Sequence, residues 1–455
     1  MRGLSLLRAA AVVAIVLGAS GLASGQGFGI YEQSPCQMGR GGAGVASPCP
    51  DASSVYFNPA GLSFTSTQLG LGASVVGPRG DFTDDTTGQV STLNSKWYPI
   101  PNIYASTPIG GRLAVGVGVF APYGLTTDWP VTSQGRFLGY KSVVQGLYIQ
   151  PTAAVKVSDK VSFGAGVDIV NLHVQLRQRV DLSTQPLPAI PGLPSGATFA
   201  LLGVTPGSDF ADINLEGDAW SVGAHFGVLV QATDKFSLGA RYMTGQSVEV
   251  DNGTIDTTQI ETPYVLPFGI PGVAPAGTDL DLLLRSRFAP GQVLSDQGAK
   301  SEIPMPAQFV AGFAVQATPA LRVLADYQFV NWSAFDELPI DGDYLKTTIV
   351  ENYKDTHGVR AGLEYAVGKG TVLRGGVDFH TAAAPDESVT PNLPEGVRQE
   401  YSAGIGQQLS EHFRLDAFYL YLYQGDRAGR TNPTTNNGVY AFHANLFGVS
   451  FGMSF

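Results

Sequence analysis

The stretch NLFGVSFGMSF, residues 445–455, alternates large apolar side chains with small ones. One face of an extended chain would carry Phe447, Val449, Phe451, Met453 and Phe455, and Gly or Ser occupies most of the other face. A period of two predicts a β-strand with one apolar face. RLAVGVGVF at residues 112–120 and FRLDAFYLY at residues 413–421 show the same alternation.

This alternation predicts fourteen strands, near residues 69–77, 98–106, 112–120, 145–157, 160–178, 215–231, 235–250, 303–317, 320–331, 353–367, 371–381, 398–409, 412–424 and 437–455. Six short connections alternate with seven long ones, at 78–97, 121–144, 179–214, 251–302, 332–352, 382–397 and 425–436. Bacterial outer-membrane barrels have an even number of antiparallel strands, short periplasmic turns and long outer loops. We therefore expect an all-β transmembrane antiparallel β-barrel with both termini in the periplasm. The barrel must close, because lipid cannot satisfy an open sheet edge.

The N-terminus has the pattern of a secretory signal peptide. Arg2 and Arg8 precede an apolar run at residues 9–19, and small residues follow at 20–26. This order predicts a signal peptide over residues 1–25, cleaved after Gly25. A short membrane anchor is the alternative, but the run is shorter than the ~20 residues that a spanning helix needs.

Charge and motifs exclude several function classes. Only 14% of the 455 residues are charged, against about 25% in soluble proteins. Without Arg2 and Arg8 the chain holds 25 basic and 38 acidic residues, so its net charge falls from −11 to −13, which disfavours nucleic acid as a partner. The 6 histidines are scattered, and catalytic or zinc-type motifs are missing. We expect no enzyme activity, metal or cofactor; an outer-membrane lipase is the enzymatic alternative.

A polar segment precedes the first strand. Residues 26–68 include DASSVYFNPAGLSF at 51–64 and are too few for a sizeable core. A fourteen-strand barrel has a lumen too wide for its wall side chains to fill. We therefore expect residues 26–68 to form a hatch inside a barrel of residues 69–455. Asn58 can bond nearby backbone, and Pro59 fixes its own φ.

The hatch contains the two cysteines of the chain, Cys36 and Cys49. In an oxidising periplasm they could close a small loop, which the chain-entropy model values at roughly 3 kcal/mol. We expect this disulfide; two free thiols are the alternative.

Several stretches together resemble one family. GFGIYEQS at 27–34 and GRGGAGVASPCPDASSVYFNPAGLS at 39–63 are similar to the plug of the FadL-type long-chain fatty-acid transporters of the outer membrane. DYQFVNWSAFDEL at 326–338 and PNLPEGVRQEYSAGIG at 391–406 continue the resemblance. The family's Asn-Pro-Ala plug motif corresponds to Asn58, Pro59 and Ala60, whereas the two cysteines depart from the family pattern.

The resemblance implies a monomeric fourteen-strand barrel with a hatch. It implies passive uptake of long-chain fatty acids or similar hydrophobic molecules, with aromatic hydrocarbons or another hydrophobic ligand as the alternative and a general porin as a further one. The expected partners are such small molecules together with outer-membrane lipid and lipopolysaccharide. The family releases ligand sideways beside a kinked early strand, which the resemblance places at 112–120, with Gly116, Gly118 and Pro122 as the candidate lateral gate.

Candidate ligand-binding residues follow from apolar loops and from cations. The loops at 179–214 and 251–302 are unusually apolar, which suggests a capture surface; packing of loop on loop is the alternative. Their candidates are Phe199, Leu201, Leu202, Leu266, Phe268, Leu283 and Leu284. A carboxylate ligand would need a cation, for which the candidates are Arg177, Arg179, Arg374 and Arg398. An arginine–carboxylate ladder that fills the lumen is the alternative.

The strand at 160–178 changes phase. Ile169 belongs to one face, but Leu172, Val174 and Leu176 belong to the other. Such a change predicts a bulge or kink in this strand.

Overall fold

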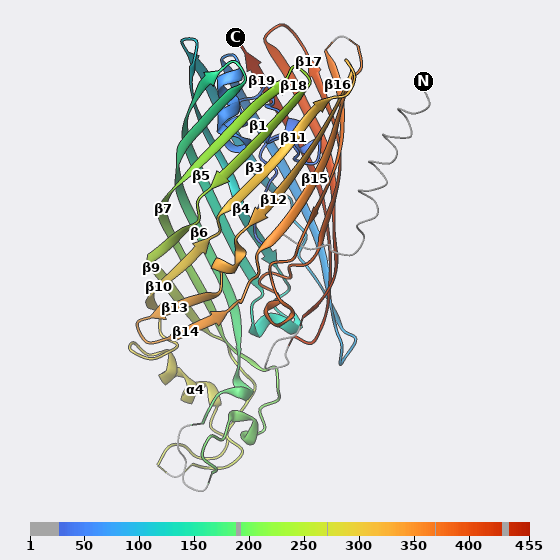
Figure 1. Ribbon diagram of the computed structural model, residues 1–455. Coiled ribbons are helices and arrows are strands. Elements are labelled where there is room, and N and C mark those ends of the chain that lie inside the picture. Colours follow the sequence, from blue (N-terminus) through green and yellow to red (C-terminus); the bar gives the residue numbers. More distant parts are fainter. Residues whose placement is uncertain (1–26, 188–192, 271, 369, 430–435) are drawn as a thin grey trace.

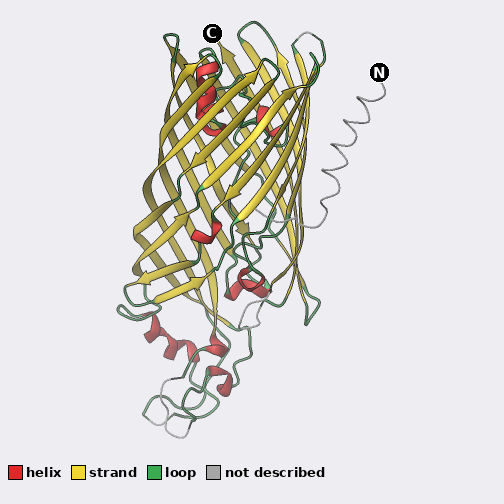
Figure 2. Cartoon of the chain, viewed as in Figure 1, coloured by secondary structure: helices red, strands yellow, loops and turns green. Residues whose placement is uncertain are grey.

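The computed structural model describes residues 27–455 except 188–192, 271, 369 and 430–435. The predicted signal peptide at 1–25 lies outside the described residues. The described chain forms one closed antiparallel barrel, in which the first strand, β1, pairs with the last, β19 (Figures 1 and 2). No helix in the described ranges is both long and apolar enough to span a membrane.

Fourteen wall strands run through the described part of the chain, and the predicted fold class and strand number are confirmed. Ten are continuous: β1 (Gln68–Asp84), β3 (Tyr98–Ile109), β4 (Leu113–Asp128), β5 (Lys141–Ser158), β6 (Val161–Asp181), β7 (Asp209–Thr233), β16 (Thr371–His380), β17 (Arg398–Gln408), β18 (Phe413–Gly429) and β19 (Gly438–Ser454). Four are interrupted: β8 (Phe236–Met243) with β9 (Gln246–Gln259), β10 (Gln297–Met305) with β11 (Gln308–Gln316), β12 (Leu321–Val330) with β13 (Glu337–Gly342), and β14 (Lys346–Val350) with β15 (Thr356–Ala366). Short β2 (Val90–Thr92) pairs with β1 inside the first long connection.

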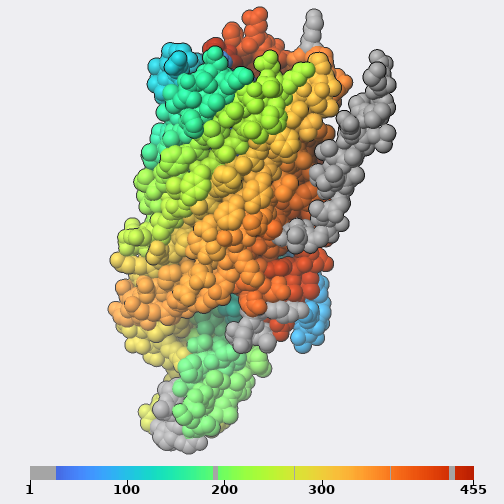
Figure 3. Space-filling model, in the orientation of Figure 1, coloured from blue at the N-terminus to red at the C-terminus, as the bar shows by residue number. Residues whose placement is uncertain are grey.

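Every second residue of a strand points outward, and in this wall those residues are mostly apolar. Large apolar side chains that alternate with buried neighbours are 38–52% exposed there, among them Leu71, Ile103, Val117, Phe163, Phe226, Leu363, Phe313 and Phe451. The long connections lie at the end of the barrel away from the C-terminus (Figure 1). The described residues of the connections at 179–214 and 251–302 project furthest there (Figure 3). The long connections contain η2 (Gln134–Phe137), η3 (Leu182–Thr184), η4 (Phe199–Leu202), α4 (Leu280–Leu284), η5 (Arg285–Phe288), η6 (Trp332–Ala334) and η7 (Asp386–Ser388).

The predicted bulge in the strand at 160–178 is wrong. β6 pairs with β7 in unbroken register from Val161 to Val180. Instead, the apolar residues change sides of a regular strand. Phe163 and Val167 face outward, whereas Leu172 is fully buried and Val174 lines a cavity inside the barrel. The phase change therefore marks the level at which the lumen, rather than the outer face, becomes apolar.

Residues 27–67, which we call the hatch, lie inside the barrel near the end with the short turns (Figures 1 and 2). The hatch contains three short helices, α2 (Pro35–Met38), α3 (Ser54–Phe57) and η1 (Pro59–Phe64). Most of its residues are buried.

Glycines on the inner face of the wall let hatch backbone approach wall backbone. An added Cβ at Gly164 would lie 2.4 Å from the amide nitrogen of Ala60, and one at Gly376 would lie 2.2 Å from the carbonyl carbon of Arg40. No real Cβ tolerates such distances. The inner face of the wall, which carries the small residues, therefore packs against the hatch. The outer face carries the large apolar residues that contact lipid.

Side-chain hydrogen bonds fix the hatch in place. The Asn58 amide donates to the carbonyls of Val45 (2.7 Å) and Val228 (3.0 Å), and its oxygen accepts from the Ala60 amide. Asp326 on β12 accepts from the backbone amides of Gly44 and Val45. These bonds satisfy buried backbone groups that the irregular hatch leaves open.

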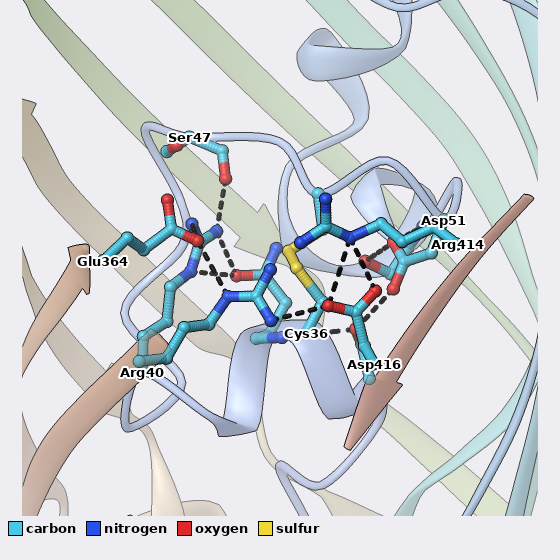
Figure 4. The surroundings of a disulfide bond; sticks show 12 residues. Cys36, Arg40, Ser47, Asp51, Glu364, Arg414 and Asp416 are labelled. Carbon is cyan, nitrogen blue, oxygen red and sulfur yellow. Dashed lines mark hydrogen bonds and ion pairs between the residues drawn. A yellow bond between two sulfur atoms is a disulfide. The ribbon is translucent and has the colours of Figure 1, made fainter. Parts of the chain in front are cut away.

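Buried ion pairs connect the hatch to the wall. Arg40 contacts Glu364 at 3.1 Å, and Arg374 bridges Glu364 (2.9 Å) and Asp416 (2.6 Å). Cys36 and Cys49 form a disulfide beside this network (Figure 4). Removing one partner of such a buried pair typically costs about 3–5 kcal/mol, so the network opposes displacement of this part of the hatch.

We predict that Gly376→Leu displaces the hatch while leaving the barrel intact. Its side chain would enter the contact with Arg40, and overpacking of this kind costs about 1–3 kcal/mol. The ion conductance of the protein in a planar bilayer should rise. Neighbouring Gly375 provides the matched control, because an added Cβ meets only the Ser402 carbonyl oxygen at 3.8 Å. Equal conductance of the Gly376→Leu and Gly375→Leu proteins would contradict this packing.

Candidate functional site

An apolar cavity, which we call the lumen cavity, lies inside the barrel between the hatch and the long connections. Its volume is about 910 Å³, including the part open to solvent. Residues from β4, β5, β6, β7, β9, β10, β13 and β14 line it, among them Leu125, Val144, Val174, Leu176, Leu215, Val250, Ile303, Leu338, Ile340 and Ile349. Phe28 of the hatch forms part of its wall. A cavity of this kind suits a hydrophobic molecule.

One carboxyl group in the lining of this cavity has neither a charged partner nor a hydrogen bond among the described residues. Glu351, on the segment between β14 and β15, lines the lumen cavity and makes no side-chain hydrogen bond or ion pair with any residue that the structure describes. Burial raises the pKa of Glu351 to about 8.

The barrel wall is open beside this cavity, between β3 and β4. The two strands pair only as far as Ile103 and Val119. A register shift then follows in β4, between Phe120 and Tyr123. From this shift onward β4 bonds to the hatch: Ile30 donates to the Pro122 carbonyl at 2.8 Å, and Gly124 donates to the Phe28 carbonyl at 2.9 Å. Pro122 lies within this register shift, next to the end of the pairing between β4 and β3.

The gap forms a second cavity, which we call the wall opening. Its volume is about 1640 Å³, including space open to solvent. Its lining extends from Leu147, 41% exposed on the outer face, to Tyr123, which is buried inside. Leu125 and Val144 line both the wall opening and the lumen cavity. The two spaces are therefore neighbours.

Hatch residues 27–30 lie between the two cavities. Phe28 lines the lumen cavity, whereas Gly29 and Ile30 line the wall opening. The Phe28 ring packs on Trp332 with centroids 4.6 Å apart. Gly27 has φ +57°, and an added Cβ there would lie 2.5 Å from the Trp332 ring, so the contact requires glycine.

Of the four candidate arginines, Arg398 alone lines either cavity. It donates to the Gly27 carbonyl at 2.9 Å and makes no ion pair with the described residues. Arg374 belongs to the hatch network, which fits the ladder alternative. Arg177 and Arg179 on β6 both contact Asp212 on β7, at 3.0 Å each, near the long connection that joins these two strands.

The loop candidates pack mainly against one another. Phe199, Leu202, Leu266 and Leu284 are buried in a shared cluster, with Leu283 packed against it. Leu201 and Phe268 are 52% and 42% exposed. This arrangement fits the packing alternative, with two residues left for capture.

The gate candidates divide. Gly116 and Gly118 lie where β4 is still paired with β3, and they face hatch residue Val55 and wall residue Tyr104. Pro122 lies in the irregular segment at the opening. The motif Asn58, Pro59 and Ala60 lies at the hatch–wall contact, outside both cavities. Sequence reasoning missed Leu125, Val144 and Glu351; the phase change in β6 was the signal for an apolar lumen.

Comparisons with known proteins agree with this architecture. The family model described as "Outer membrane protein transport protein (OMPP1/FadL/TodX)" matches residues 16–455. The long-chain fatty acid transport protein of Escherichia coli O6:H1 is 24% identical, with 94% of each chain covered. Outer membrane protein P1 of Haemophilus influenzae is also 24% identical, over 96% of this chain and 97% of that one.

Two solved structures share the fold. A Pseudomonas aeruginosa FadL homologue superimposes with a TM-score of 0.77 at 18% identity and covers 94% of this chain and 100% of its own. The Pseudomonas putida toluene transporter TodX gives a TM-score of 0.69 at 18% identity, over 95% and 99% of the two chains.

We predict that Arg398→Met loosens hatch residues 27–30. A hydrogen bond to a charged group contributes about 1.5–3 kcal/mol, so amide hydrogen exchange of these residues should accelerate roughly tenfold to a hundredfold. Mass spectrometry of the 27–34 peptide would measure this rate. Arg177→Met, which removes a cation distant from the hatch, should leave the rate unchanged. Unchanged exchange in the Arg398→Met protein would contradict the anchoring role.

Proposed function

Because this chain belongs to the outer membrane transport protein family OMPP1/FadL/TodX, we propose that it passively carries long-chain fatty acids or similar hydrophobic molecules. One observation carries this proposal: an apolar lumen cavity adjoins an opening through the barrel wall, and Leu125 and Val144 line both. An apolar molecule gains about 25 cal/mol for each Å² that it removes from water. A path that keeps it shielded at every stage therefore needs no energy source.

The proposed path has three stages. Exposed apolar residues of the outer loops, such as Leu201 and Phe268, capture the ligand weakly. The ligand then enters the lumen cavity and displaces hatch residues 27–30. It leaves through the wall opening, past Leu147, into the lipid. This route leaves the ion pair between Arg40 and Glu364 intact, whereas passage through the hatch would break it.

Arg398 gives a fatty acid its place in this path. A chain that extends from the lumen cavity past Leu125 would bring a carboxylate into the wall opening, where Arg398 makes no ion pair with the described residues and would be shared with Glu32. The long-chain fatty acid transport protein of Escherichia coli supports this ligand class. The fold shared with a toluene transporter supports the second candidate, an aromatic hydrocarbon. The cation in the described lining of the lumen cavity, Lys300, is paired with Asp251. This pairing favours an aromatic hydrocarbon, which carries no charge.

The proposed setting is the outer membrane, with both ends of the chain on the periplasmic side. The first wall strand begins, and the last one ends, at the short-turn side of the barrel, where Gln68 pairs with Ser454. A monomer in contact with outer-membrane lipid and lipopolysaccharide, without catalysis or a cofactor, remains our expectation.

We predict that Leu147→Trp reduces uptake of labelled oleate and labelled toluene to a small fraction of the wild-type rate. The indole would narrow the wall opening at its outer edge. The assay uses cells that lack their own transporter and express equal amounts of folded barrel.

Leu238→Trp is the matched control, because Leu238 is similarly exposed (44%) on β8, outside both cavities. Uptake of oleate but not toluene by the wild type would assign fatty acids, and the reverse would assign hydrocarbons. Equal uptake by the two variants would rule out lateral release at this opening.

A further inference from the structure

We propose that the lumen cavity also binds hydrophobic cations, such as alkyl ammonium ions, with Glu351 as their counter-charge. The proposal rests on the proposed function, because it takes the lumen cavity as a ligand site. It adds a ligand class of opposite charge to a fatty acid.

Glu351 is fixed at the cavity by its backbone. Its amide donates to the Asp336 carbonyl at 2.7 Å, and its own carbonyl accepts from the Ser388 hydroxyl. Its side chain makes neither an ion pair nor a hydrogen bond with the residues that the structure describes. An ionised carboxylate in an apolar environment is costly unless it is paired, so a bound cation would stabilise the ionised form of this group.

Aromatic rings accompany this carboxyl group. Phe28, Phe335 and Tyr353 all line the same cavity. The Phe335 ring lies 5.6 Å from Phe28 and 5.1 Å from Tyr353, centroid to centroid. Aromatic faces attract ammonium groups, and cages of such rings recognise quaternary ammonium ligands. The rings are thus a second feature that favours a cation, independent of the carboxyl group.

The other charged groups around the cavity have partners. Glu216 on β7 accepts from the Gln175 amide at 3.0 Å, and Lys300 on β10 contacts Asp251 at 3.2 Å. Glu395, in the connection before β17, accepts from the backbone amides of Gly27, Ala383 and Ala384. Tyr353 adds only a phenol. Glu216 bonds only to neutral amides, from Gln175 and Asn214. Glu351 is therefore the carboxyl group of the described lining that has neither a cation nor a hydrogen-bond donor as its partner.

The pH dependence has a defined sign. Glu351 is mainly protonated at neutral pH, because burial raises its pKa to about 8. A bound cation favours the ionised form, so binding releases this proton. The affinity for a permanent cation must therefore rise with pH and level off above about pH 8.

The test measures binding of decyltrimethylammonium and of 1-decanol to the full-length protein in lipid nanodiscs by calorimetry, with protein-free nanodiscs as the blank. The affinity for decyltrimethylammonium should rise roughly tenfold or more between about pH 6 and pH 9. The affinity for 1-decanol, which carries no charge, should show no such rise.

Glu351→Gln should abolish the rise for decyltrimethylammonium while leaving 1-decanol binding in place. Glu387→Gln, the same change at an exposed residue of a neighbouring connection, should keep the wild-type profile. A pH-independent affinity in the wild type, or a rise that persists in Glu351→Gln, would overturn the proposal. Absence of 1-decanol binding would instead refute the lumen cavity as a ligand site, and with it the proposed function.

Discussion

A barrel of fourteen strands satisfies the backbone hydrogen bonds of its wall in lipid, but it leaves a lumen that wall side chains cannot fill. The hatch meets this constraint with irregular backbone, which must find polar partners of its own. Inward glycines such as Gly164 and Gly376 admit that backbone. Asn58 and Asp326 supply hydrogen bonds, and buried ion pairs complete the contact.

The same constraint explains the wall opening. A strand that leaves its neighbour exposes unpaired backbone groups unless another segment binds them. Where β4 separates from β3, hatch residues Phe28 and Ile30 bond to β4 beyond the shift at Phe120–Tyr123. The hatch therefore closes the lumen and stabilises the gap at once. Movement of this short segment would expose few polar groups, whereas expulsion of the whole hatch would break the buried ion pair between Arg40 and Glu364.

Much of the fold could be predicted from the sequence, because lipid imposes a simple rule on outward residues, as in the run from Phe447 to Phe455. The rule fails where the lumen itself is apolar. In β6 the rule led to the wrong prediction of a bulge. The apolar residues Leu172 and Val174 point inward there because the lumen is apolar at their level. Glu351 could not be found, because its isolation depends on residues from strands far apart in the chain. Gly116 and Gly118 were assigned by resemblance, but their small size serves contacts below the opening. Arg398 could be named among other arginines, and only packing distinguishes it.

A photoreactive fatty acid would show whether the ligand leaves sideways through the barrel wall. After illumination of the protein in lipid, mass spectrometry would locate the cross-links. Sideways release should give labels around Leu125, Val144 and the outward-facing Leu147. A separate space on the short-turn side of the hatch is lined by Ser47, Thr65 and Leu229. Labels on those residues, with Leu147 unlabelled, would show passage through the hatch and rule out sideways release.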